Sequence, residues 1–171
     1  MAPGGAVGLG ASPCPAGWVG YVDPGGRFSI CYPSEFSATA SDDAVNLDSP
    51  RFPGQQAELL GLAVGWDATP GTAYYPPSAE NCPQYLVMGQ TASAFLELTL
   101  DGRAVPACFN QGRLDGTPAV ALGSVQGAIP VAADGSDSDG YIRFAANFTG
   151  QVEPIPPLAG AIIATLHVGA N

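Results

Sequence analysis

Apolar and polar residues alternate along much of the chain, with the two-residue period of a β-strand. The alternation is clearest in residues 27–33, where Phe28, Ile30 and Tyr32 fall on one face, and Pro33 ends the strand because it cannot donate a ladder hydrogen bond. Further strand patterns occupy residues 17–22, 44–47, 57–66, 117–127 and 140–150. The pattern therefore predicts a chain rich in short strands.

Two segments carry helical spacing instead. Tyr85, Met88, Ala92 and Phe95 recur every three or four residues, and we predict a short helix over about 83–91, followed by a hairpin over 94–109. Leu158, Ala161, Ile162 and Thr165 predict a C-terminal helix. Strands with two helices favour an α+β fold, an antiparallel β-sheet flanked by helices. The alternative is an all-β sandwich.

Length and composition indicate one globular domain. The chain has 171 residues, of which 46% are hydrophobic, and its 23 Gly and 17 Pro favour short elements joined by turns. We interpret residues 1–13 as a flexible N-terminal tether and 14–171 as the domain. No apolar run approaches the ~20 residues that span a bilayer, so we expect no transmembrane segment.

The charge of the chain excludes some partners. Its net charge is −10, it has no Lys, and its five Arg are scattered. Nucleic-acid binding requires a clustered basic face, so we expect no nucleic acid as a partner. Attraction to an anionic membrane is equally disfavoured.

Four cysteines indicate disulfides more than a metal site. Cys14, Cys31, Cys82 and Cys108 form no C-x-x-C pair, so we expect no zinc. Sequence order and strand proximity favour pairing Cys14 with Cys31 and Cys82 with Cys108, among three connectivities. Disulfides imply an oxidising compartment. We therefore expect an extracellular, periplasmic or cell-surface protein, with its signal peptide removed because residues 1–18 lack the features of one.

The segment "GWVGYVDPGGRFSICYPSEF" (17–36) resembles the start of PsbP-like domains, which have an aromatic-led strand, a turn and then "GFSI.YP..W". "LAGAIIATLHV" (158–168) resembles the terminal helix of that family. The resemblance implies an α-β-α sandwich that serves as an accessory or binding module and not as an enzyme. Phe36 stands where the family usually has Trp, and the absence of Lys and the four cysteines are also departures. They suggest a secreted bacterial relative.

Candidate chemistry is sparse. Asp134, Asp137 and Asp139 in "DGSDSDG" offer oxygen ligands for Ca²⁺, but the spacing does not fit an EF-hand, and a solvated hairpin tip is the favoured interpretation. We expect no other cofactor. His167 is the only histidine and lies near the C-terminus, and no G-x-S-x-G motif accompanies it. No catalytic residue is therefore assigned.

Aromatic residues offer a further recognition site. Trp66, Tyr74, Tyr75 and Phe109 are candidates to line a groove for a peptide or sugar, although aromatics that cap a sheet edge are the favoured interpretation. The sequence thus predicts a secreted, non-enzymatic accessory domain that acts through a protein partner or self-assembly. The alternatives are a small extracellular hydrolase and a Ca²⁺- or carbohydrate-binding module.

Overall fold

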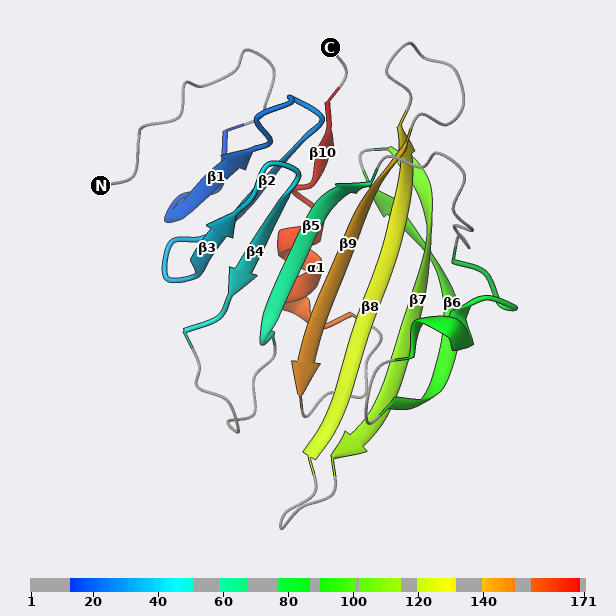
Figure 1. The fold of residues 1–171 in the computed structure, drawn as a ribbon. Coiled ribbons are helices and arrows are strands. Elements are labelled where there is room, and N and C mark those ends of the chain that lie inside the picture. Colours follow the sequence, from blue (N-terminus) through cyan, green and yellow to red (C-terminus); the bar gives the residue numbers. More distant parts are fainter. Residues whose placement is uncertain are drawn as a thin grey trace.

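The computed structural model describes residues 13–50, 59–67, 77–86, 90–100, 102–114, 120–131, 140–149 and 155–169. Strands form most of this part of the chain, arranged in two antiparallel sheets (Figure 1). The small sheet has the order β1–β2–β10 and joins the two ends of the described chain. Its strands are β1 (Trp18–Val22), β2 (Phe28–Pro33) and β10 (His167–Val168).

The large sheet has seven strands in the order β3–β4–β5–β9–β8–β7–β6. Its strands are β3 (Ser37–Ala40), β4 (Ala44–Asp48), β5 (Gly61–Asp67), β6 (Gln90–Leu100), β7 (Arg103–Leu114), β8 (Val120–Val131) and β9 (Gly140–Thr149). The four longest lie together in the half formed by β6–β9. The short β3 forms the opposite edge.

One face of the large sheet, called here the inner face, holds the core. Alternate residues of its strands, such as Val64 on β5 and Phe144 on β9, are buried there because successive side chains of a strand point to opposite faces. The small sheet adds Phe28 and Ile30 to the same cluster. The helix α1 (Pro157–Ile163) adds Ala159 and other residues, and Figure 1 shows it behind the large sheet.

Two phenylalanines on β9 lie over two glycines on β8. Phe144 pairs with Gly127 and Phe148 with Gly123 across the strands. A β-carbon at either glycine would overlap the facing ring. The four-residue spacing is the same in "GSVQG" and "FAANF", so the rings fill the space that the absent side chains leave.

The predicted hairpin over 94–109 is confirmed. β6 and β7 pair from Gln90 to Leu100, with Leu100 opposite Arg103. Gly102 follows in the turn at φ 71°, a left-handed conformation that glycine adopts without steric cost. The strands predicted at 17–22, 27–33, 44–47, 57–66, 117–127 and 140–150 correspond to β1, β2, β4, β5, β8 and β9.

The predicted α+β class with flanking helices is wrong, and the all-β alternative fits the two sheets. In place of a helix over 83–91 the chain forms a short 3-10 helix, η1 (Cys82–Tyr85), and β6 already begins at Gln90. Residues 87–89 lie outside the described residues. The helical spacing of Ala92 and Phe95 is overridden because β7 pairs with this segment from Ala92 to Leu100.

The C-terminal helix is shorter than predicted. α1 ends at Ile163, and His167 and Val168 then pair with Ser29 and Phe28 of β2. Thr165 stabilises this change of direction, since its hydroxyl accepts from the backbone N–H of Cys31 at 2.9 Å and donates to the carbonyl of Ile162 at 2.7 Å. In the described ranges, no helix has the length and apolarity to cross a membrane.

Candidate functional site

The outer face of the large sheet carries small and polar side chains in transverse rows. In one row Thr39, Asn46, Ala63, Ala145 and Gln126 lie opposite one another on five successive strands. The neighbouring row runs across the whole sheet and consists of Ser37, Asp48, Gly61, Asn147, Ser124, Asn110 and Ser93. Both rows arise from the alternation that places large apolar residues on the inner face.

The half of this face over β3, β4, β5 and β9 is open and hollowed. One hollow of about 330 Å³ is lined by residues that include Asn46, Asp48 and Asn147. A second, of about 290 Å³, lies between Ala44 on β4 and Tyr85 beyond β8. Both are lined by Ala63, and together they form one trough over five strands, β3, β4, β5, β9 and β8. We call this trough the outer-face groove.

The floor of the groove is made of small residues. Ala63 and Gly65 of β5 and Ala145 of β9 lie between the larger side chains of its rim. Asn46 and Asn147 are exposed, so their amide groups are accessible to a ligand. Each amide offers two N–H donors and one carbonyl acceptor. The open half therefore presents hydrogen-bonding groups above a flat, small-residue floor.

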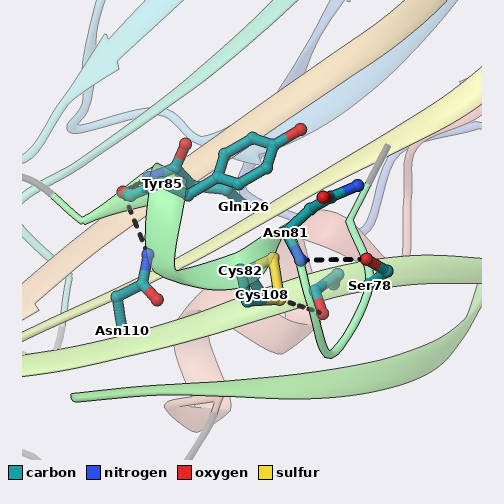
Figure 2. The surroundings of a disulfide bond; sticks show 8 residues. Ser78, Asn81, Cys82, Tyr85, Cys108, Asn110 and Gln126 are labelled. Atoms are coloured by element: carbon teal, nitrogen blue, oxygen red, sulfur yellow. Dashed lines mark hydrogen bonds between the residues drawn. A yellow bond between two sulfur atoms is a disulfide. The ribbon is translucent and has the colours of Figure 1, made fainter. Parts of the chain in front are cut away.

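One wall of the groove is built by η1 and held by a disulfide (Figure 2). Cys82 of η1 is bonded to Cys108 of β7, and both are buried. The carbonyl oxygen of Tyr85 accepts from Asn110 Nδ2 at 3.0 Å and from Gln126 Nε2 at 3.2 Å. These contacts fix the half-buried Tyr85, whose side chain and backbone contribute to the groove wall.

Segment 77–86 covers the half of the outer face over β6–β8. Asn110 and Ser124 are fully buried there, and Ser124 Oγ accepts from Gln90 Nε2 at 2.9 Å. Asn110 donates to Tyr85, whereas its Oδ1 has no hydrogen-bond partner. In this half the polar side chains of the row form hydrogen bonds mainly within the protein, and few of their donors and acceptors remain for a ligand.

Two charged side chains, one on β5 and one on β9, lie at one end of the groove. Arg143 of β9 forms an ion pair with Asp67 of β5, and both side chains are partly exposed. Arg143 also lines the groove. The charges of Arg143 and Asp67 therefore balance each other locally.

A second polar cluster joins the two sheets. Arg27, after the β1–β2 turn, bonds Asp23 through Nε at 2.6 Å and through a second nitrogen at 2.8 Å. It also reaches Asp43 at 3.0 Å in the β3–β4 turn, and its guanidinium lies 5.3 Å from the ring of Trp66. The arrangement ties the small sheet to the edge of the open half.

This cluster shifts the pKa values of its members. Burial raises the pKa of Asp23, but the hydrogen bonds and charge of Arg27 together outweigh it, and the pKa of Asp23 lies below its ordinary value. The hydrogen bond to Asp23 is the main reason why the pKa of Arg27 is raised. Burial, followed by the charge of Asp23, raises the pKa of Tyr21. Asp23 and Arg27 therefore stay ionised at neutral pH.

The small sheet has its own hollow of about 430 Å³, beside the disulfide between Cys14 and Cys31. His167 lines it and is exposed, and its partner across the strands is Ser29. A serine hydrolase needs a hydrogen-bonded Ser–His pair that a third group orients. No carboxylate lines this hollow among the described residues. His167 is remote from the outer-face groove.

The structure separates the predicted recognition aromatics. Phe109 is 3% exposed and stacks on Phe148 within the core. Trp66 is half-buried at the end of the inner face, packed against the core and beneath Arg27. Tyr74 and Tyr75 lie outside the described residues. Neither Trp66 nor Phe109 lines the outer-face groove.

The cysteines pair as the sequence order favoured, Cys14 with Cys31 and Cys82 with Cys108. The predicted calcium ligands Asp134, Asp137 and Asp139 lie outside the described residues, as does the predicted tether apart from Pro13. Within the described ranges, no group of three or more His, Cys, Asp or Glu residues is placed to hold a metal ion.

Sequence reasoning missed the groove residues Asn46, Asn147 and Tyr85. The available signal was the small-residue face of 57–66, together with the polar positions of the strands at 44–47 and 140–150. Strand order was needed to align them, since β5 and β9 are neighbours but lie far apart in sequence.

In comparisons with known proteins, no protein-family model matches the chain, and no curated protein matches it. The two disulfides are consistent with a secreted or extracellular protein.

Proposed function

We propose that the chain is an extracellular, non-enzymatic binding module whose outer-face groove takes a neutral oligosaccharide. The observation that carries this proposal is the open half of the outer face, where exposed amides surround a floor of small residues. It corresponds to the carbohydrate-binding alternative from the sequence. The accessory role, the PsbP-like resemblance and location at the cell surface or in the periplasm remain predictions.

Sugar chemistry fits the groups around the groove. Hydroxyl groups both donate and accept hydrogen bonds, and amides such as those of Asn46, Asn147 and Gln126 do the same. Tyr85 supplies an aromatic body with a polar end, which suits a ligand that has both apolar and hydroxylated surface. The small floor allows a flat ring to approach the backbone of β5 and β9 closely.

The charges favour a neutral ligand over an anionic one. Asp48 lines the groove, Arg143 is paired with Asp67, and the whole protein carries a net charge of −10. An acidic polysaccharide would be repelled by this field. An open trough across several strands has room for several linked sugar units along its length. This favours an oligosaccharide over a single sugar.

Isothermal titration calorimetry with a panel of neutral oligosaccharides tests this proposal. The double variant Asn46→Ala/Asn147→Ala should weaken binding by at least about tenfold, because it removes two amides that line the groove. His167→Ala, an exposed change on the other sheet, is the matched control and should bind as the wild type does. If no neutral oligosaccharide binds the wild type, the proposal is wrong.

The same panel of oligosaccharides distinguishes a binding module from a hydrolase. A binding module leaves the oligosaccharide intact, so chromatography after long incubation should show no new reducing ends. Release of reducing sugar that disappears in His167→Ala would instead identify an enzyme that uses this histidine.

A further inference from the structure

The β6 strand is a long edge of the large sheet (Figure 1). It has 11 residues, about 37 Å of extended chain, and pairs on one side with β7. In the described part of the chain no strand pairs with its other side. In an antiparallel ladder about half of the backbone N–H and C=O groups of an edge strand point away from its neighbour.

This edge lacks the features that usually prevent strand pairing. Proteins protect edges with prolines, lysines, bulges or very short strands. Between Gln90 and Leu100 there is no Pro, Lys or Arg, and Glu97 is the single charged residue. One register shift occurs between Gln90 and Ala92, at the end of the strand. The remaining residues are free to form a regular ladder.

Apolar side chains lie on both faces of the edge. Phe95, on the outer face, is 42% exposed and is one of three large exposed hydrophobic residues among those described. Leu96 and Leu98, on the inner face, are half-buried and pack against the core. The core therefore extends to this edge of the sheet, beyond which the described residues place no further strand.

We propose that β6 is a self-association surface, at which the β6 strands of two copies pair antiparallel about a two-fold axis. The pairing joins the two large sheets into one. Leu96 and Leu98 of each copy then continue the core of the other, and the two Phe95 side chains meet on the outer face, where aromatic cross-strand pairs are stabilising. This proposal goes beyond the proposed function and is independent of it.

The β6 strand of a second copy is a better partner for this edge than β3, the strand at the other edge of the sheet. β3 has only four residues, so pairing β6 with β3 would satisfy a fraction of the 11-residue ladder. Pairing two β6 strands uses both long edges, and a two-fold arrangement closes. The expected product is therefore a dimer and not an open filament.

Electrostatics permit this register and predict its salt dependence. A pairing centred on Phe95 places Glu97 opposite Ser93 of the second copy, so the two Glu97 carboxylates do not face each other. Each copy nevertheless carries a net charge of −10, which repels the other. Dimerisation should strengthen as salt rises from low to physiological concentration, because salt screens this repulsion.

Sedimentation equilibrium on the full chain, over a range of concentrations, measures the association. The wild type should show a monomer–dimer equilibrium. Phe95→Lys should raise the dissociation constant at least about tenfold, because it places two cations at the centre of the interface. The matched control is Val22→Lys, since Val22 is 48% exposed on the small sheet and should leave the equilibrium unchanged. Circular dichroism confirms that both variants are folded.

Hydrogen exchange read by mass spectrometry locates the interface. Amides of 90–100 should exchange more slowly at high protein concentration than at low concentration, while amides of β3 should not change. A wild type that stays monomeric up to about 1 mM, where association contributes less than about 4 kcal/mol, would overturn the proposal. So would a dimer that persists in Phe95→Lys, unchanged exchange in β6, or growth into filaments.

Discussion

Asn110 and Asn147 lie in the same row of the outer face, two strands apart, yet their surroundings differ. Asn110, on β7, is 0% exposed and donates to Tyr85 beneath the segment 77–86. Asn147, on β9, is exposed and lines the outer-face groove. A buried amide must find partners inside the protein, whereas an exposed one is free to exchange water for a ligand.

The two halves of the sheet also differ in how they are attached to the rest of the protein. The covered half, over β6–β8, is fixed by the covalent bond between Cys82 and Cys108. The open half is tied to the small sheet at the β3–β4 turn through Arg27, which contacts Asp23 and Asp43. The first attachment is sensitive to reduction and the second to acid. Each of the following predictions tests part of this contrast.

The largest effect is expected from removing the covalent attachment. Cys82→Ala/Cys108→Ala should lose about 3.5 kcal/mol of unfolding free energy in the chain-entropy estimate for a separation of 26 residues. Cys14→Ala/Cys31→Ala, with a separation of 17, should lose about 3 kcal/mol. Urea unfolding measures both. Only the first pair should also expose Tyr85, which its fluorescence in a Trp-free background would report.

The inner face beneath both halves depends on Phe144 over Gly127. Gly127→Ala should destabilise the fold by about 2–3 kcal/mol, because the new methyl group overlaps the ring. In the matched outer-face variant Gly61→Ala, the β-carbon would lie 3.0 Å from the backbone oxygen of Leu47, and a small shift relieves the contact. We expect at most about 1 kcal/mol there. Equal losses in urea unfolding would contradict this account of the β8–β9 pair.

Alanine substitutions at Asn110 and Asn147 compare the covered and open halves of the outer face directly, through their effects on the unfolding free energy. Asn110→Ala should lower the unfolding free energy by about 1–2 kcal/mol, because Tyr85 loses a buried donor. Asn147→Ala should change it by less than about 0.5 kcal/mol, because the side chain is exposed. Thermal unfolding of both variants measures this difference. A stability loss at Asn147 as large as that at Asn110 would show that the open half is structural.

The smallest effect is expected from acid, because Arg27 is partly exposed and solvent screens the pair. The pKa of Asp23 is lower in the folded protein than in the unfolded chain. Its pairing therefore stabilises the fold above the unfolded pKa of about 4, and this contribution is lost as the pH falls below that value. Asp23→Asn should flatten the profile of stability against pH between about 5 and 2. An unchanged profile would rule out this role.

Local patterns predicted most strands and the hairpin over 94–109. They failed where two periodicities overlapped, since Tyr85, Met88, Ala92 and Phe95 fit a helix while 94–100 also alternate. They also missed β3, whose residues Ser37–Ala40 are small, polar and exposed. Such a strand carries no hydrophobic pattern and forms because β4 presents a free edge.

The sequence by itself determined which residues face the core in strands with clear alternation, such as Phe28 and Ile30 of β2, since alternation depends only on neighbouring positions. It also narrowed the disulfide pairing, because nearby cysteines close short loops at low entropic cost. The tertiary structure alone decided the order of the strands, and with it the alignment of Asn46, Ala63 and Asn147 around one groove. That alignment depends on contacts between residues about 80 positions apart, such as Ala63 and Ala145, which local pattern does not encode. Strand order also left β6 at an edge, where no strand in the described part of the chain pairs with its second side.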